Sequence, residues 1–146
     1  MQQVSTDQRL QILVAEDNLI NQRVILRTLE KMGHRVTLVS DGRRAVEAAQ
    51  RDRFDIILMD CQMPEMDGFE ATRQIRACSN VEVRRIPVFA LTAFAQEEDR
   101  HRCLAAGMND YLRKPIDLRE LAVKLEAVAR ARQTAKVELA SGVPDA

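Results

Sequence analysis

The most informative part of the chain is Phe54-Asp55-Ile56-Ile57-Leu58-Met59-Asp60, which Met63-Pro64-Glu65-Met66-Asp67-Gly68 follows almost at once. Its nearly continuous apolar run is typical of a strand that is buried on both faces of a parallel sheet. The run ends in the carboxylate of Asp60, where a loop that contains Pro and Gly begins. Because loops held on a rigid scaffold carry function, Asp60 is a candidate for chemistry.

Strand-like and helix-like segments alternate on both sides of this stretch. Strands are expected at residues 11–15, 36–39, 55–59, 87–91 and 110–113, and helices at 18–32, 41–50, 69–77, 96–106 and 117–132. A polar stretch, residues 79–85, leads into the fourth expected strand. This alternation predicts an α/β fold, a (βα)5 unit with a parallel five-stranded sheet and helices on both faces.

The composition of the strands predicts their order in the sheet. The first, third and fourth strands are apolar and should be central. The second strand carries the polar residues Arg35, at its start, and Thr37, and the fifth is short and polar. Edge positions for these two fit the flavodoxin-like order 2-1-3-4-5. That order places the ligand crevice between strands one and three, at their carboxyl ends, so Asp17 and Asp60 should face each other across it.

Composition limits the classes of function. The chain has 146 residues with 22 Lys plus Arg and 22 Asp plus Glu, 3% aromatic residues and no Trp. Balanced charge and few aromatic rings argue against nucleic-acid binding. No apolar stretch approaches the ~20 residues that span a bilayer, and the start lacks a secretory signal, so direct membrane contact is not expected.

The three cysteines, Cys61, Cys78 and Cys103, have no C-x-x-C spacing, which argues against zinc or a disulfide framework and favours the reduced cytoplasm. We expect a monomer or weak dimer. The expected organisation is an N-terminal linker at residues 1–8, one domain at 9–132 and a C-terminal tail or linker at 133–146.

Three carboxylates should gather at the predicted crevice: Glu16, Asp17 and Asp60. They would repel one another in a partly dry site, and a divalent cation removes that repulsion. Oxygen ligands suit Mg²⁺ or Mn²⁺, and one Asp oxygen would remain free as a nucleophile for a phosphoryl group. Glu16-Asp17 alone would equally fit a polar loop in which Asp17 caps the next helix.

Two further polar residues end apolar runs at the same edge. Lys114 would supply a compact cation for phosphoryl charge, and the Lys114–Pro115 bond is a candidate for the cis form. The Thr92 hydroxyl could donate to a phosphoryl oxygen. Taken singly, Lys114 would fit a surface lysine and Thr92 a strand-end cap.

Five motifs together resemble the response-regulator receiver domain of two-component signalling, over roughly residues 9–132. They are Leu13-Val14-Ala15-Glu16-Asp17-Asn18, Leu58-Met59-Asp60-Cys61-Gln62-Met63-Pro64, Met66-Asp67-Gly68, Leu91-Thr92-Ala93 and Leu112-Arg113-Lys114-Pro115. The resemblance implies that Asp60 is the phosphoacceptor. It also implies that Asp17, Asp60 and the Gln62 backbone carbonyl bind the metal, with Glu16 bound to it through water.

The resemblance further implies that Lys114 pairs with the phosphoryl group, that Thr92 is the switch hydroxyl and that Tyr111 is the switch aromatic residue. The donor would be a phosphohistidine on a histidine kinase or a histidine phosphotransfer domain. That partner is expected to dock near Leu19 and Ile20, although burial of this apolar pair in the core is an open alternative. The domain would catalyse its own phosphorylation and dephosphorylation without being a turnover enzyme.

Three phrases resemble receivers of hybrid sensor histidine kinases: Glu16-Asp17-Asn18-Leu19-Ile20-Asn21-Gln22, Met59-Asp60-Cys61-Gln62-Met63-Pro64 and Ala106-Gly107-Met108-Asn109-Asp110-Tyr111-Leu112. The chain is therefore interpreted as a segment excised from such a kinase, with a stand-alone single-domain response regulator as the alternative. Phe94, two residues after Thr92, departs from the smaller polar residue frequent in this branch. We hypothesise that its ring obstructs the water that would attack phospho-aspartate.

Three other classes compete with this interpretation. A haloacid-dehalogenase-like phosphatase would carry a second Asp at position 62, where the chain has Gln62. A flavodoxin-like electron carrier would need a phosphate loop after the first strand, where Glu16-Asp17 would repel the anion. An interaction module that has lost phosphorylation is disfavoured because every acceptor-site residue is present.

Overall fold

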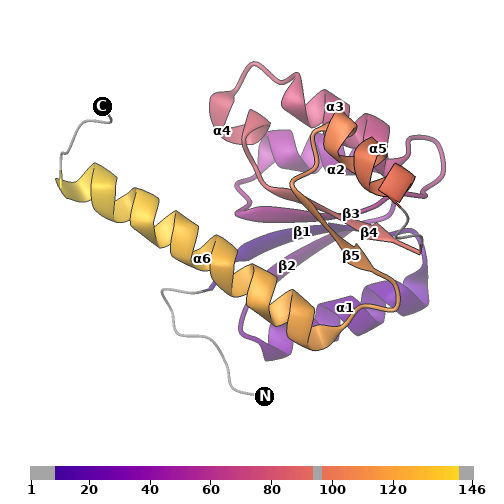
Figure 1. Cartoon of the computed structure of the whole chain (residues 1–146), viewed down its shortest axis with the longest axis horizontal. Helices are drawn as coiled ribbons and strands as arrows, with labels where there is room; N and C mark the ends of the chain where they lie inside the picture. The colour runs from indigo at the N-terminus through magenta and orange to yellow at the C-terminus, as the bar shows by residue number, and fades with distance from the viewer. Residues whose placement is uncertain (1–8, 94–96, 142–146) are drawn as a thin grey trace.

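The computed structural model describes residues 9–93 and 97–141. Its centre is one parallel sheet, with strand order β2-β1-β3-β4-β5 (Figure 1). The strands are β1 (Gln11–Ala15), β2 (Arg35–Val39), β3 (Ile56–Asp60), β4 (Val88–Thr92) and β5 (Asp110–Arg113). The predicted flavodoxin-like order is confirmed, with β2 and β5 at the edges.

Strand register brings the candidate residues to one edge of the sheet. Ala15 pairs with Met59, Asp60 pairs with Leu91, and Thr92 pairs with Arg113. Parallel strands end on the same side, so the residues that follow β1 and β5 lie at the same level as the last residues of β3 and β4.

Helices cover both faces of the sheet. They are α1 (Leu19–Lys31), α2 (Gly42–Arg51), α3 (Gly68–Arg76), the one-turn α4 (Val81–Arg84), α5 (Glu97–Ala106) and α6 (Leu118–Ser141). Helices α1 and α6 lie on one face, and α2, α3 and α5 lie on the other (Figure 1). Asn18, Asp41 and Asp67 each begin a helix by accepting a hydrogen bond from the amide three residues further on.

Successive side chains of each strand point to opposite faces of the sheet, which divides the core into two layers. Leu13, Ile57 and Met59 pack with α2, α3 and α5, whereas Ile12 and Leu58 pack with α1 and α6. All five residues of β3 are buried, because helices cover both of its faces. This central strand therefore fixes the position of the Asp60 backbone.

Two helical segments differ from the expectation. Residues 81–84 form a helical turn in the polar stretch for which no helix was predicted, and the Asn80 side chain caps it by accepting a hydrogen bond from the Glu82 amide, 2.9 Å away. Helix α6 reaches Ser141, so the predicted end near Arg132 is wrong. Residues 133–141 contain neither Gly nor Pro, and the first such residues are Gly142 and Pro144.

The expected linker at residues 1–8 and the end of the expected tail, 142–146, lie outside the described residues. The limits of the domain therefore stay a prediction. Within the described part of the chain, no helix is both long enough and apolar enough to cross a bilayer.

Candidate functional site

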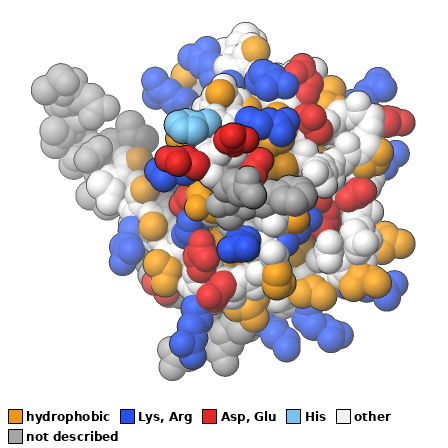
Figure 2. All heavy atoms as spheres, turned by 45° about the vertical axis from the view of Figure 1, so that its right-hand side comes forward, with side chains coloured by type: hydrophobic (Ala, Val, Ile, Leu, Met, Phe, Trp, Pro, Cys, Tyr) orange, Lys and Arg blue, Asp and Glu red, His pale blue; other side chains and the backbone are white. Residues whose placement is uncertain are grey.

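A cleft of about 730 Å³ opens at the carboxyl edge of the sheet. This edge faces the viewer in Figure 2, where acidic and basic side chains lie close together near the middle of the face. The cleft is lined by six residues that the sequence singled out: Glu16, Asp17, Asp60, Gln62, Thr92 and Lys114. The fold thus brings together side chains that are up to 98 residues apart in the chain.

The three carboxylates converge although they differ in burial. Glu16 and Asp60 are 2% and 5% exposed, whereas Asp17 is on the surface. One oxygen from each of the three lies within 4.8 Å of the others. Because Glu16 and Asp17 directly follow β1 and Asp60 ends β3, the pairing of these two strands creates the cluster.

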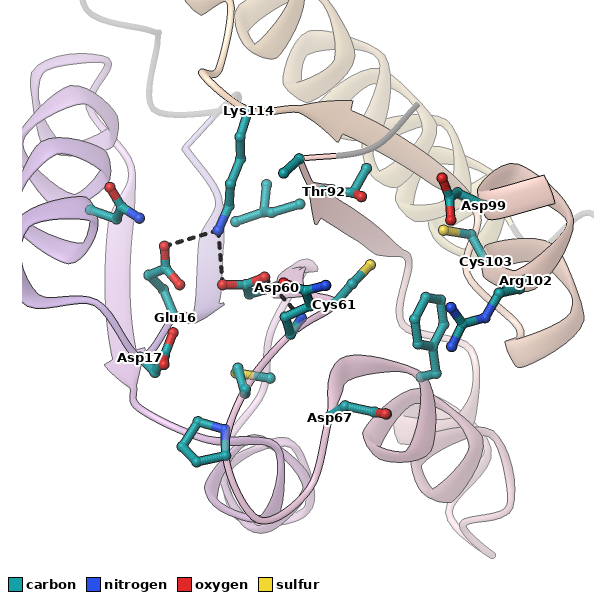
Figure 3. A pocket seen from close by; sticks show the side chains of 17 residues that line it. Glu16, Asp17, Asp60, Cys61, Asp67, Thr92, Asp99, Arg102, Cys103 and Lys114 are labelled. Atoms are coloured by element: carbon teal, nitrogen blue, oxygen red, sulfur yellow. Dashed lines mark hydrogen bonds and ion pairs between the residues drawn. The ribbon is translucent and has the colours of Figure 1, made fainter. Parts of the chain in front are cut away.

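Lys114 connects two of these carboxylates. Its Nζ lies 2.8 Å from Asp60 Oδ2 and 3.2 Å from Glu16 Oε1 (Figure 3). The backbone amide of Lys114 donates to the Thr92 carbonyl across the β4–β5 edge, 2.7 Å away. The Lys114–Pro115 peptide is cis, as the sequence allowed.

The backbone around Asp60 is closely packed. The Gln62 amide donates to Asp60 Oδ1 over 3.0 Å, and the Cys61 carbonyl accepts from the Gly68 amide over 3.2 Å. A Cβ on Gly68 would lie 2.2 Å from the Asp60 carbonyl oxygen. Gly68 therefore allows the start of α3 to lie against the end of β3.

The acidic cluster changes the protonation of its members. Burial, a hydrogen bond to Asp60 and the Asp60 charge raise the pKa of Glu16 to about 7, against the opposing effects of Asn21 and Lys114. Burial acts to lower the pKa of Lys114, but hydrogen bonds to and charges on Asp60 and Glu16 outweigh it, so that pKa is raised. The site thus holds a strongly cationic lysine beside carboxylates that are costly to ionise together.

The donor set of this cluster fits a hard divalent cation. Glu16 Oε2 is buried and has no hydrogen-bond partner among the described residues, and buried polar atoms are otherwise nearly always satisfied. The candidate ligand atoms that converge here are carboxylate oxygens, and oxygen ligands suit Mg²⁺ or Mn²⁺.

Some residues of the cleft were not predicted from the sequence. Asn21, Asp99 and Arg102 also line it, and the Arg102 guanidinium lies 4.4 Å from the centre of the Phe69 ring. Asn21 could have been found as a first-turn residue of the helix that follows Glu16-Asp17-Asn18. Asp99 and Arg102 reach the cleft only because α5 packs beside α3, which no local pattern reports.

Other predicted residues lie apart from this cleft. Tyr111, on β5, is half-buried and lines a neighbouring groove with Leu104 and Lys124. Leu19 and Ile20 are 70% and 73% exposed, which resolves the open choice between surface and core. Phe94 lies outside the described residues.

A flavodoxin-like sheet with an acidic, lysine-linked cleft at its carboxyl edge defines the class of this domain. The chain belongs to the response regulator receiver domain family, whose family model matches residues 12–126. It is similar to the sensor protein GacS of Pseudomonas syringae pv. syringae, with 44% identity over 112 residues, 76% of this chain and 12% of that protein. It is accordingly a receiver domain of two-component phosphorelay signalling, homologous to receivers of hybrid histidine kinases.

Two solved structures share the fold. The receiver domain of sensor histidine kinase PA1611 from Pseudomonas aeruginosa PAO1, with magnesium coordinated in its active-site cleft, is 51% identical with a TM-score of 0.76, covering 83% of this chain and 98% of that one. The receiver domain of Saccharomyces cerevisiae Ssk1, crystallised with the histidine phosphotransfer protein Ypd1, is 30% identical with a TM-score of 0.77. The match covers 85% of this chain and 91% of that one. The chain spans 6% to 15% of the first curated relatives it matches.

Proposed function

We propose that Asp60 accepts a phosphoryl group from a phosphohistidine on a partner protein. The observation that carries this proposal is the contact of Lys114 Nζ with both Asp60 and Glu16 inside an acidic cleft. In the transfer, an Asp60 carboxylate oxygen forms a bond to phosphorus as the phosphorus–nitrogen bond to histidine breaks. Lys114 pairs with the phosphoryl oxygens, whose charge would otherwise meet three carboxylates.

The acidic cluster is the proposed site of Mg²⁺ or Mn²⁺. Asp17, Asp60 and the Gln62 backbone carbonyl would hold the ion, and Glu16 would bind it through water. When bound, the ion supplies positive charge that offsets the carboxylates and the phosphoryl oxygens. The magnesium in the similar PA1611 receiver supports this assignment.

Thr92 and Tyr111 are the proposed switch residues. Thr92 ends β4 at the cleft and would move its hydroxyl toward the phosphoryl oxygens. Tyr111 lies on β5, in the surface formed by α5, β5 and α6, where Lys124 Nζ contacts the Tyr111 carbonyl at 3.1 Å and Asp110 Oδ2 at 2.7 Å. A change at the cleft would thus bias a surface that a downstream partner can read.

The proposed docking surface for the phosphohistidine domain is the exposed apolar end of α1. Leu19, Ile20 and Val24 are 70%, 73% and 59% exposed, and Leu118 of α6 adds a fourth apolar side chain across a groove of about 450 Å³. Hydrophobic side chains gather at the lower right of the face in Figure 2, where α1 lies. Such a patch beside the acceptor fits a helical partner, and the similar Ssk1 receiver was crystallised with a histidine phosphotransfer protein, Ypd1.

Basic residues continue this surface along α1. Arg23, Arg27 and Lys31 are exposed and lie four residues apart, on one stripe of the helix. They would add electrostatic attraction to a partner whose docking face is acidic. The partner is a histidine kinase or a histidine phosphotransfer domain, and the chain is proposed to be part of a hybrid sensor histidine kinase in the cytoplasm.

Intact-mass measurement tests the central proposal. Incubation with Mg²⁺ and acetyl phosphate is expected to add one phosphoryl group to the wild-type chain and none to Asp60→Asn. Asp52→Asn, a change on the surface away from the cleft, is the matched control and should be phosphorylated normally. Phosphorylation of Asp60→Asn to the wild-type level would contradict the assignment, and sustained release of phosphate from external esters would favour the phosphatase alternative.

A further inference from the structure

Two cysteines meet in the wall of the cleft, beside the acceptor residue. Cys61 directly follows Asp60, and Cys103 lies on α5. Figure 3 shows the two side chains turned toward each other across the cleft wall, and both belong to the same buried cluster. Both residues are free cysteines in the reduced form.

The thiols are enclosed by the protein, yet they border an open space. Cys61 and Cys103 are 6% and 4% exposed, but both line the cleft of about 730 Å³. A small reagent can therefore reach them from the cleft. The third cysteine, Cys78, lies elsewhere, where its sulfur contacts Gln50 Nε2.

The two sides of this contact differ in how firmly they are held. On the β3 side, the Cys61 amide donates to Leu91 over 3.1 Å and the Cys61 carbonyl accepts from Gly68 over 3.2 Å. On the other side, the described residues of α5 that are buried are only Cys103 and Ala106, whereas α3 buries Phe69 and Ile75 among others. Cys103 is thus a main anchor of a weakly held helix.

We propose that Cys61 and Cys103 are a redox-active pair, and that a disulfide between them ties α5 to the residue next to Asp60. The oxidant is a small-molecule disulfide. A Cys103 thiolate attacks one of its sulfurs, forming a mixed disulfide and releasing one small thiolate, which takes up a proton. Cys61 then loses its proton and attacks the Cys103 sulfur, releasing the second small thiol.

This sequence of steps transfers two electrons from the cysteine pair to the small disulfide, which becomes two thiols. Cys103 is assigned the first attack because it lies on α5, the less firmly held side of the contact, and lines the cleft from which the reagent enters.

The consequence of the disulfide follows from the position of α5. Asp99 and Arg102 of α5 line the same cleft as Asp60, and a disulfide bond is far shorter than a contact between two thiols. Formation of the bond therefore draws α5 toward β3 and restricts its movement. Phosphorylation of Asp60, which we propose moves the adjoining surface, should be slower in the oxidised protein.

The test uses the Cys78→Ser chain, which retains only the two cysteines of the pair. It is equilibrated at mildly alkaline pH with 2-hydroxyethyl disulfide and 2-mercaptoethanol in a series of ratios, and then trapped with an alkylating reagent under denaturing conditions. The expected oxidised product has lost two hydrogen atoms, takes up no alkyl group and yields a Cys61–Cys103 linked peptide. Persistent mixed disulfide, or two alkylated thiols at every ratio, would overturn the proposal.

Two further readouts connect the bond to the fold and the site. Amide hydrogen exchange in α5 should slow several-fold on oxidation, and phosphorylation by acetyl phosphate should slow and then recover after reduction. Cys61→Ala in the same background should show neither response to the redox buffer. Linked peptide without any change in α5 exchange would refute the tether, whereas lack of phosphorylation in the reduced chain would refute the proposed function alone.

Discussion

Glu16 is the carboxylate of the cleft whose protonation should change near neutral pH. Its pKa of about 7, set by burial and by Asp60, lies above the ordinary value of 4.5. In the metal-free chain, Glu16 is therefore more fully protonated in the folded state than in the unfolded state between pH 4.5 and about 7. Its contribution to stability is present below pH 4.5 and is lost as pH rises toward 7.

A divalent cation should compete with that proton. We expect Mg²⁺ affinity to rise with pH and to weaken by about tenfold per pH unit below 7, because binding displaces one proton from Glu16. Calorimetric titration between pH 5.5 and 8 measures this dependence. Glu16→Gln should bind more weakly and lose this component of the pH dependence, and the exposed control Glu47→Gln should behave as wild type. A pH-independent affinity in the wild-type chain would contradict the expectation.

Gly68 is the residue at which an added methyl group should matter most near Asp60. A Cβ there would meet the Asp60 carbonyl oxygen at 2.2 Å, so one of two backbone segments must move. We expect Gly68→Ala to lower the free energy of unfolding by about 1–3 kcal/mol and to slow phosphorylation. Urea unfolding and acetyl phosphate kinetics measure both effects, with Arg73→Ala on the exposed side of α3 as control. Wild-type values for Gly68→Ala would show that the loop adapts.

Helix α1 is the element that should separate partner recognition from chemistry. Its exposed apolar end lies beside the cleft without forming the cleft's charge contacts. We expect Ile20→Glu to slow phosphotransfer from a phosphorylated histidine phosphotransfer domain by about tenfold or more, the range for a buried interface residue. Phosphorylation by acetyl phosphate should remain normal.

The matched control for this element is Val123→Glu, because Val123 of α6 is also apolar and 62% exposed. It should leave both reactions unchanged. Equal slowing by Ile20→Glu and Val123→Glu, or slowing of the acetyl phosphate reaction by Ile20→Glu, would argue against the docking surface on α1.

At the scale of the whole molecule, polar contacts close the sheet edge opposite the cleft. Arg132 Nη1 of α6 donates to the Arg9 carbonyl over 2.8 Å and contacts Asp55 Oδ2 at 3.0 Å, and Asp55 also accepts from the Gln11 amide. Nearby, the buried His34 accepts from the Leu10 amide through Nδ1. The residues that limit the predicted domain, Arg9 and Arg132, are therefore bonded to each other.

Removal of the Arg132 contacts should destabilise the domain, whereas removal of the residues after Arg132 should not. We expect Arg132→Ala to lower the free energy of unfolding by about 1–3 kcal/mol, because charged hydrogen bonds are lost. A chain ending at residue 132 should unfold within about 0.5 kcal/mol of the full chain, because the described side chains just beyond it, at 133–135, are exposed. Urea unfolding measures both, and a large loss on truncation would contradict the predicted boundary.

His34 should make stability fall in acid. Burial, followed by the charges of Arg132 and Arg9, lowers the pKa of His34 below its ordinary value of 6.5, against the effect of Asp55. Unfolded His34 then binds the proton more tightly, so stability is lost as pH falls below 6.5. The difference in unfolding free energy between wild type and His34→Ala should shrink over that range. A constant difference from pH 7.5 to 5 would contradict this account.

The sequence by itself determined the sheet order and the edge at which the site lies. Apolar runs distinguished central from edge strands, and each run stopped at a polar residue, so Glu16, Asp60, Thr92 and Lys114 could be assigned to one edge. The prediction succeeds because hydrophobic periodicity and strand composition can be read from neighbouring residues in the sequence. In addition, parallel strands necessarily end on the same side of their sheet. The end of α6 was wrong because nothing between Arg132 and Gly142 stops a helix.

Only the tertiary structure decided which side chains meet and at what distance. The bridge from Lys114 to Glu16 and Asp60, the exposure of Leu19 and Ile20, and the contact of Cys61 with Cys103 depend on how separate elements pack. No local pattern encodes these, because the partners lie tens of residues apart and their approach is set by helix packing on the sheet. The same packing raises the pKa of Glu16, since burial and the nearness of Asp60 exist only in the folded chain.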